Sequence, residues 1–251
     1  KKARIGAGVS IGPGTVIHDN VAIGRGSVIE GHCILGVPSK AAKGKPLVIR
    51  ESSHIRSHSV FYEGSSFGKG LVTGHGALVR ENCLAGRDLQ IGSHCVIDGD
   101  CAIGDYVKLH TGVSIGKGSK IGRFVYLFPY VQLTNDPVPP SFIIKGVTIK
   151  DMAVVAAQAC LLPGITVGLG AFVGAGSVVR SSVADLHCVT GNPAAVFSTI
   201  DRFISPEYGV YHPWTRRFKA KYPPASYPLM RALVGKIDGL IRRRRPAGSR
   251  S

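Results

Sequence analysis

An aliphatic residue recurs every six positions through most of this 251-residue chain. The period runs in three blocks, which begin at Ile5, Ile49 and Ile149 and together hold 27 repeat positions. Ile, Leu or Val occupies 23 of these positions. The exceptions are Phe61, Phe67, Thr73 and Ala85. An internal repeat of fixed period indicates a stacked architecture, in which each unit packs on its neighbours.

Each six-residue unit also carries its own corner. Three residues after the aliphatic position stands a residue that accepts a positive φ at low cost, usually Gly or Asn, as at Gly8, Gly14 and Asn20. An α-helix has a period of 3.6 and cannot satisfy a period of six, and a hairpin sheet needs no corner every six residues. The sequence therefore predicts short strands that alternate with corners and stack as a coil.

The repeat resembles that of the hexapeptide-repeat transferases over nearly 180 residues. The resemblance implies an all-β fold, a left-handed parallel β-helix of triangular section with three hexapeptides in each coil. The blocks hold 6, 15 and 6 units, which corresponds to about nine coils. We expect residues 1–190 to form this β-helix, with an external loop near 134–146, and residues 191–251 to form a C-terminal extension.

The net charge of +16 is concentrated in the extension, where residues 201–251 contain twelve Lys or Arg against three acids. An apolar stripe at helical spacing lies there, made of Leu229, Leu233, Ile237, Leu240 and Ile241. It predicts a short amphipathic helix that docks on the coil or on a neighbouring subunit. Contact with an anionic membrane surface is the alternative, because four arginines follow the stripe. Nucleic-acid binding is not indicated, since no basic segment is interleaved with aromatic residues.

Other features of the sequence favour a cytoplasmic protein. The chain is 44% hydrophobic, but no apolar run approaches the length of a membrane span, and the N-terminus enters the repeat at once. Four of the six cysteines occupy the small inward position of the repeat, namely Cys33, Cys83, Cys95 and Cys101. We expect these to be reduced core thiols and not disulfide or zinc ligands.

The second interruption of the repeat is the stretch LTNDPVPPSFIIKGVTIK at 133–150. Loops that leave a rigid solenoid have fixed ends and free tips, so functional residues collect there. Thr134, Asn135 and Asp136 stand where the strand leaves the coil, and three prolines stiffen the next part of the loop. An ordinary turn is the alternative interpretation, since Asn-Asp-Pro suits one well.

This loop resembles the one beside the active site of hexapeptide enzymes that transfer acyl groups from acyl-CoA to nucleotide-linked amino sugars. VKLHTG at 107–112 resembles the strand of those enzymes that contacts the amine, and GNPAAV at 191–196 resembles their exit turn beside the adenine of CoA. The resemblance departs at Val138 and Pro140, where that branch often has His or Arg. It implies an N-acyltransferase that uses acetyl-CoA, for surface polysaccharide or glycoconjugate synthesis.

His110 is the residue expected to carry the chemistry. It follows Leu109, so strand alternation points it outward, onto a face that the next subunit of a trimer would cover. A neutral His can act as the base for an amine that attacks a thioester, or it can only hydrogen-bond the amine. We expect Asn135 and Asp136 to act with His110 as catalytic residues that orient the amine or the sugar hydroxyls. Thr111 and Thr134 are the candidates for substrate binding.

CoA requires a long groove with cations at one end. The resemblance implies that its pantetheine lies along the last coils between two subunits, where the residues are small. The candidates are Ala156, Ala157, Gly174, Ala175 and Gly176, with Asn192 and Pro193 at the exit turn. Lys145, Lys150 and Arg180 flank these coils and are candidates for the phosphates, with ordinary surface charge as the alternative.

One flat prism face is too shallow to bury CoA, so we expect a homotrimer with three sites between subunits. We expect no metal requirement. A zinc site like that of the family's carbonic anhydrases needs three outward histidines, whereas His32, His58 and His94 fall at corners. Two other classes stay open: an O-acyltransferase that acts on a sugar hydroxyl, and a non-catalytic β-helix scaffold.

Overall fold

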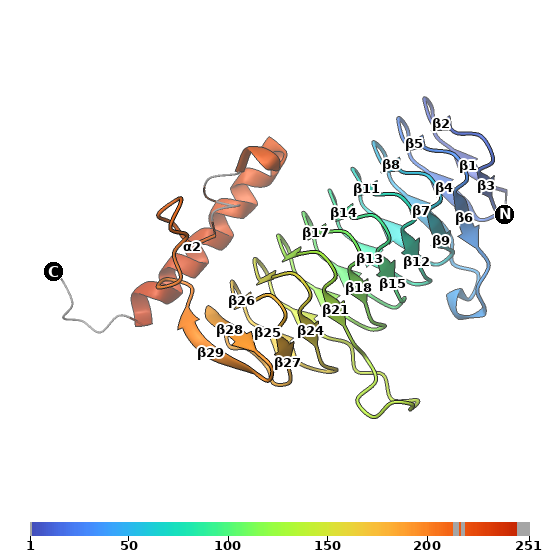
Figure 1. Ribbon diagram of the computed structural model, residues 1–251. Helices are drawn as coiled ribbons and strands as arrows, with labels where there is room; N and C mark the ends of the chain where they lie inside the picture. Colours follow the sequence, from blue (N-terminus) through green and yellow to red (C-terminus); the bar gives the residue numbers. More distant parts are fainter. Residues whose placement is uncertain (1, 213–215, 217–218, 245–251) are drawn as a thin grey trace.

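The six-residue period is realised as one short strand in each repeat, with three strands in each coil. The computed structural model describes residues 2–212, 216 and 219–244. Successive coils stack into a prism with three flat sides, and the C-terminal segment lies along one edge of it (Figure 1). Each side is a sheet, named A, B or C in the order in which the chain enters it. The predicted parallel β-helix is confirmed.

Each of the three sheets takes one strand from every coil. Sheet A contains β1 (Arg4–Ile5), β4 (Val21–Ile23), β7 (Leu47–Ile49), β10 (Ser66–Phe67), β13 (Leu84–Ala85), β16 (Ala102–Ile103), β19 (Lys120–Ile121), β22 (Thr148–Ile149) and β25 (Thr166–Val167). Sheet B contains β2 (Ser10–Ile11), β5 (Val28–Ile29), β8 (His54–Ile55), β11 (Val72–Thr73), β14 (Gln90–Ile91), β17 (Lys108–Leu109), β20 (Tyr126–Leu127), β23 (Val154–Val155), β26 (Phe172–Val173), β28 (His187–Gly191) and β29 (Ala194–Thr199). Sheet C contains β3 (Val16–Ile17), β6 (Ile34–Val37), β9 (Val60–Tyr62), β12 (Leu78–Val79), β15 (Val96–Ile97), β18 (Ser114–Ile115), β21 (Gln132–Leu133), β24 (Cys160–Leu161) and β27 (Val178–Val179).

Within the described residues, sheets A and C have nine strands each and sheet B has eleven. These numbers agree with the predicted coil count of about nine. A partial further turn comes after them, in which Val183 bridges to Val167 and β28 pairs with β26. The chain then reverses, because β29 pairs with β28 in antiparallel orientation.

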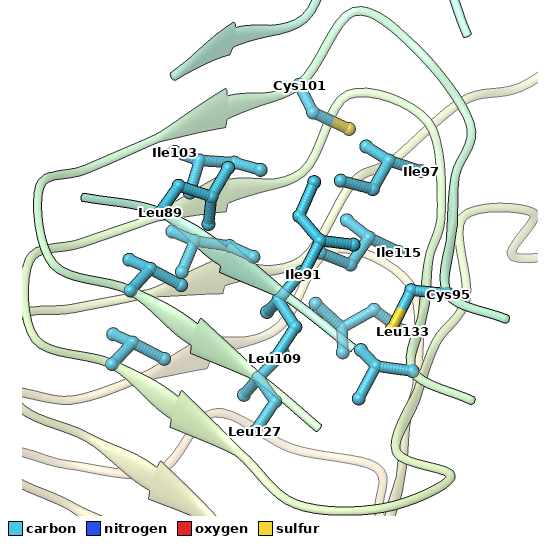
Figure 2. Packing of buried hydrophobic residues seen from close by; sticks show 14 of the residues in the cluster. Leu89, Ile91, Cys95, Ile97, Cys101, Ile103, Leu109, Ile115, Leu127 and Leu133 are labelled. Carbon is cyan, nitrogen blue, oxygen red and sulfur yellow. The ribbon is translucent and has the colours of Figure 1, made fainter. Parts of the chain in front are cut away.

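The repeated aliphatic residues fill the interior of the prism. In sheet C, Ile97 pairs with Ile115, and Ile115 pairs with Leu133 in the next coil, so identical positions stack along the axis (Figure 2). Cys95 and Cys101 point into the same core. All four cysteines that were predicted to be core thiols, Cys33, Cys83, Cys95 and Cys101, are buried and free. The core is therefore a set of columns that run the length of the coil.

The corners adopt the backbone conformation that the sequence predicts. His32, His58 and His94 have φ values of 58°, 60° and 55°. The rings of His32 and His58 stack with their centroids 5.2 Å apart. We name the three edges of the prism by the sheets that they join: the A–B edge follows the sheet A strands, the B–C edge follows the sheet B strands, and the C–A edge follows the sheet C strands.

Both interruptions of the repeat leave the coil at the C–A edge (Figure 1). The first contains the short 3-10 helix η1 (Lys40–Ala42). It folds back on the coil, because Asn82 donates a hydrogen bond from Nδ2 to the carbonyl oxygen of Ala41 (3.0 Å) and Ala42 is buried. The second follows Leu133 and rejoins the coil at Val147. Both are external loops, and the second is the external loop predicted near 134–146.

The predicted amphipathic helix is α2 (Tyr227–Arg244), which follows the 3-10 helices η2 (Lys219–Lys221) and η3 (Pro224–Ser226). Its buried residues are Met230, Leu233, Ile237 and Ile241, while Leu229 and Leu240 are partly buried in the same cluster. The helix therefore docks on the coil of its own chain, along the A–B edge (Figure 1). Its apolar stripe is consequently occupied by protein.

The A–B edge is shaped to receive α2. Tyr106, Phe124, Met152 and Leu186 occupy four of five successive corners, with φ values of 61°, 55°, 60° and 64°, and all four belong to the buried cluster that includes the helix. Bulky residues are uncommon at positive φ, so their presence marks the covered part of the edge. Gly170 stands in the same column with φ +61°, and a Cβ there would lie 3.0 Å from Cδ1 of Ile237.

A pair of glycine substitutions separates backbone strain from helix docking. Gly26 lies at an uncovered corner of the same edge, with φ +63° and no atom within 4 Å of a Cβ. Gly26→Leu should cost about 1–2 kcal/mol, the strain of a left-handed residue. Gly170→Leu should cost about 1–3 kcal/mol more, because its side chain meets α2. Urea unfolding measures both. Equal losses would mean that the helix does not press on this corner.

Candidate active site

The B–C edge carries a continuous ladder of candidate residues. The backbone N–H of His110 donates to Leu127 O (2.8 Å), that of Ala156 to Val173 O (2.9 Å), and that of Gly174 to Val189 O (2.8 Å). These three residues therefore occupy the same position of successive coils, with Phe128 between His110 and Ala156. Coils are spaced by about 4.8 Å. Thr111, Ala157 and Ala175 follow at the next position, so six of the predicted site residues share one edge.

The imidazole of His110 is exposed and fixed by its neighbour. The backbone N–H of Thr111 donates to Nδ1 of His110 (2.9 Å). A neutral imidazole has one N–H, so an Nδ1 that accepts leaves the proton on Nε2. In this arrangement Nε2 is a donor and does not accept a proton. Of the two roles considered for His110, this hydrogen bond favours the binding role.

The proline-stiffened loop lies on a different edge, one face of the prism away. Thr134 donates from Oγ1 to Leu161 O (2.9 Å), and Asn135 O accepts from the backbone N–H of Lys145 (2.8 Å). Asp136 accepts hydrogen bonds from Ser141 Oγ (2.6 Å), Ser141 N (2.7 Å) and Val138 N (3.0 Å). The hydroxyl of Ser141 is the main cause that lowers the pKa of Asp136. In one subunit these groups organise the loop itself.

The remaining predicted site residues are distributed over all three edges. Lys145 and Arg180 are exposed on the C–A edge. Lys150 lies on the A–B edge, where its Nζ is 3.0 Å from Oδ1 of Asp185 in an ion pair. Asn192 and Pro193 form the tip of the β28–β29 hairpin, next to Gly191, whose N–H donates to Ser177 Oγ (3.2 Å). The tip thus continues the B–C edge beyond Ala175.

Within one chain, the structure brings the small residues and the hairpin tip together with His110 and Thr111 on the B–C edge. It does not bring them to Thr134, Asn135, Asp136, Lys145 and Arg180, which lie across sheet C. The sequence contains the signal for this division. A residue lies on the edge that follows its preceding strand, and each successive repeat belongs to the next sheet. His110 follows a strand of sheet B, whereas Thr134 follows a strand of sheet C.

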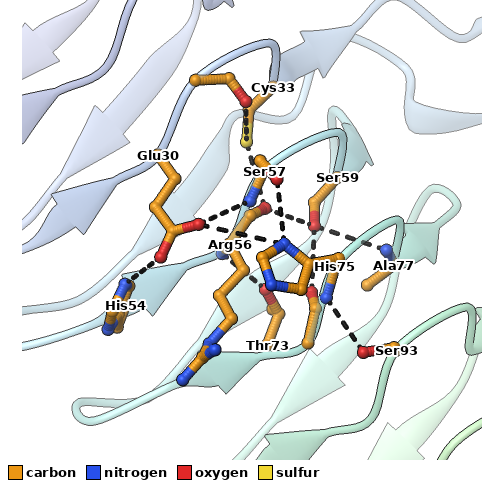
Figure 3. A network of polar contacts seen from close by, with 12 residues as sticks. Glu30, Cys33, His54, Arg56, Ser57, Ser59, Thr73, His75, Ala77 and Ser93 are labelled. Carbon is orange, nitrogen blue, oxygen red and sulfur yellow. Dashed lines mark hydrogen bonds and ion pairs between the residues drawn. The ribbon is translucent and has the colours of Figure 1, made fainter.

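A polar cluster on the N-terminal coils of the B–C edge was not predicted from the sequence (Figure 3). Oε1 of Glu30 lies 2.8 Å from Nε2 of His54, and Oε2 accepts from the backbone N–H of Ser57 (3.1 Å). Ser57 Oγ is 2.9 Å from Nδ1 of His75. The contact with His54 is the main cause that lowers the pKa of Glu30. Glu30 follows Ile29 just as His110 follows Leu109, which is the signal that could have found it.

A groove of about 430 Å³ lies on the outer face of sheet B, between the polar cluster and His110. Its floor is formed by the outward residues of successive strands, Val72, Gln90, Lys108 and Tyr126. His110 and Thr111 line its rim, and Arg56 stands at its N-terminal end.

Among the described residues, no group of three or more His, Cys, Asp or Glu could hold a metal ion. The described helices include none that is long and apolar enough to cross a membrane.

Comparisons with known proteins agree with the repeat. Residues 2–36 match the family model for the bacterial transferase hexapeptide, six repeats. A serine acetyltransferase of Bacillus subtilis (strain 168) is 41% identical over 85 residues, which are 34% of this chain and 38% of that protein. Serine acetyltransferase 4 of Arabidopsis thaliana is 34% identical over 114 residues, which are 43% of this chain and 30% of that protein. The chain thus spans less than half the length of these relatives.

Two solved structures are also similar to this chain. One is a mutant of AntD, an N-acyltransferase from Bacillus cereus, in complex with dTDP and coenzyme A. It is 19% identical, with 54% of this chain and 83% of that chain covered and a TM-score of 0.47. The other is the UDP-N-acetylglucosamine acyltransferase of Francisella novicida, at 21% identity, 82% and 72% coverage and a TM-score of 0.45.

Proposed function

We propose that this chain is an acyltransferase that moves an acetyl group from acetyl-CoA to the amino group of a nucleotide-linked amino sugar. The observation that carries the proposal is the hydrogen bond from Thr111 N to Nδ1 of His110, which leaves an Nε2–H donor on an edge lined by small residues. Ala156, Ala157, Gly174 and Ala175 project little from this edge, so an extended pantetheine chain can approach the backbone there.

The donor has a defined task in thioester aminolysis. The amine nitrogen attacks the carbonyl carbon, and the carbonyl oxygen becomes negatively charged. Nε2–H of His110 donates a hydrogen bond to this oxygen. The carbon–sulfur bond then breaks and CoA leaves as a thiolate, while the proton lost by the amine passes to the thiolate or to water. No proton has to be accepted by His110.

The same observation favours an amine over a hydroxyl as the acceptor. A neutral amine attacks with its own lone pair and loses a proton afterwards, whereas a hydroxyl needs a base as it attacks. With Nδ1 engaged by Thr111, His110 does not supply that base. A second candidate is acetylation of the serine hydroxyl, because the serine acetyltransferase of Bacillus subtilis is 41% identical over 85 residues. It requires the His110 ring to give up its contact with Thr111.

We further propose a homotrimer. The loop that contains Asn135 and Asp136 leaves the C–A edge, and His110 lies on the B–C edge. A cyclic arrangement about a threefold axis would set the C–A edge of one subunit against the B–C edge of the next. The loop also exposes large apolar residues, with Phe142 fully accessible and Val138 at 66%. Such side chains are normally covered by a partner.

Acyl transfer to a defined panel tests the proposed reaction. The chain should release thiol from acetyl-CoA with dTDP-4-amino-4,6-dideoxyglucose and should be far slower with the corresponding 4-hydroxy sugar nucleotide, since only the amine attacks without a base. L-serine is the third acceptor. Faster turnover of L-serine would establish the second candidate. Failure to bind any CoA thioester would favour a scaffold.

Two substitutions at His110 distinguish a donor from a base. His110→Gln keeps an N–H donor and should retain kcat within about tenfold, whereas His110→Ala should lose roughly 10²- to 10³-fold, as expected for one oxyanion donor. The side chain is exposed, so both variants should melt like the wild type. Equal and large losses in both variants would assign a base to this position.

The subunit arrangement can be measured separately. Sedimentation velocity of the wild-type chain should give the mass of three chains, because the apolar loop residues need a partner surface. Replacing Phe142 with Ser should shift the distribution toward single chains. A wild-type chain that sediments as a monomer would contradict the shared site.

A further inference from the structure

The groove on sheet B has an unbalanced charge. Two of its lining residues, Arg56 and Lys108, are cations, and none of the described residues that line it is Asp or Glu. Some surface cations of the chain are paired with carboxylates: Nη2 of Arg123 lies 2.6 Å from Asp151, and Nζ of Lys117 lies 3.0 Å from Asp100. Arg56 and Lys108 form no such pair with a described carboxylate, and both line the same groove.

Lys108 is held in place by the C-terminal extension. Its Nζ donates to the carbonyl oxygen of Lys221 (3.2 Å) and lies 4.2 Å from the centroid of the Tyr222 ring. Tyr222 is itself fixed, since it is only 4% exposed and its ring packs edge-on to Phe124 at 5.4 Å. Burial is the main cause that lowers the pKa of Lys108. A cation that loses water without gaining a carboxylate binds an added anion favourably.

Arg56 faces the other end of the groove with its side chain uncommitted. Its backbone N–H donates to Thr73 Oγ1 (2.9 Å), which anchors the main chain. Its guanidinium forms no hydrogen bond or ion pair with the described part of the chain, and it extends away from Glu30 (Figure 3). A planar guanidinium suits oxyanions because it donates two parallel hydrogen bonds.

We propose that this groove binds an oxyanion of the acyl acceptor, a phosphate or a carboxylate, between Arg56 and Lys108, and that the C-terminal extension completes the site by fixing Lys108. The inference rests on the proposed function, because His110 lines the same groove. An acceptor anchored by its anion on sheet B would present its nucleophile at the B–C edge. The extension is then part of the acceptor site as well as a cover for the A–B edge.

Equilibrium binding tests the inference without requiring turnover. We would titrate dTDP and L-serine into the wild-type chain by calorimetry in a buffer free of phosphate, with thymidine and L-serinamide as the matched probes that lack the phosphate or the carboxylate. We expect dTDP or L-serine to bind and its counterpart without the anion to bind at least tenfold more weakly, as expected for the loss of charged hydrogen bonds. Preference for dTDP identifies a phosphate site and preference for L-serine a carboxylate site.

Variants assign the binding to the two cations. Lys108→Met and Arg56→Met should each lower the affinity for the anionic probe about tenfold or more. CoA binding should be unchanged. Lys108→Arg, which keeps the positive charge, should retain most of the affinity for the anionic probe. Lys120→Met removes an exposed lysine from sheet A and should have no effect. If neither anion binds at millimolar concentration, or if both Met variants bind it like the wild type, the inference is wrong. Anion binding without acyl transfer would keep the inference and refute the proposed reaction.

A second pair of variants tests the contribution of the extension. The hydroxyl of Tyr222 is buried and finds no hydrogen-bond partner among the described residues. Tyr222→Phe therefore keeps the ring over Lys108 and should bind the anion like the wild type. Tyr222→Leu removes the ring and should weaken binding of the anionic probe several-fold, while binding of the probe that lacks the anion is unchanged. Equal binding by the two variants would separate the extension from the site.

Discussion

The interior stack of aliphatic side chains is the constraint on which the rest of the structure depends. Because each coil must place the same residue above the same residue, the strands can be only a few residues long and the chain must turn after every one. The turn needs a positive φ, which Gly, Asn and His provide at most corners. Stacking and turning together produce three edges whose residues repeat in register. The candidate site residues lie on those edges.

The three edges have different occupants. The A–B edge receives α2 through bulky corner residues, the C–A edge releases both loops, and the B–C edge carries His110 above a run of small residues. Within a single prism, sheet C therefore separates the polar groups of the loop on the C–A edge from His110 on the B–C edge. The groove on sheet B connects two of these regions, since it is lined by His110 and by Lys108, and Lys108 donates a hydrogen bond to Lys221 of the C-terminal extension. This geometry links the extension to the edge that bears the candidate active site.

Much of the fold could be predicted because its signals are local. The period of six, the corner residues, the inward cysteines and the apolar stripe of α2 each involve residues close in sequence. The docking position of α2 was not predicted, although Tyr106 and Phe124 at corner positions indicate a covered edge. The cluster of Glu30 and His54 was also missed, because the first loop adds residues between their coils and disturbs the register by which neighbours are counted. The tautomer of His110 depends on one backbone hydrogen bond, which no sequence pattern reveals.

The ladder on the B–C edge has a consequence for how such a protein can change over evolution. Equivalent residues of successive coils lie roughly 5 Å apart, so the distances along this edge are multiples of that spacing. Adding or losing a whole coil ahead of Glu30 would leave every interval between His110 and Gly174 intact. The same change between His110 and Ala156 would alter the distance between these residues by one coil spacing, and a ligand that contacts both would no longer fit. The number of coils is therefore free to vary ahead of Glu30 and is fixed between His110 and Gly174.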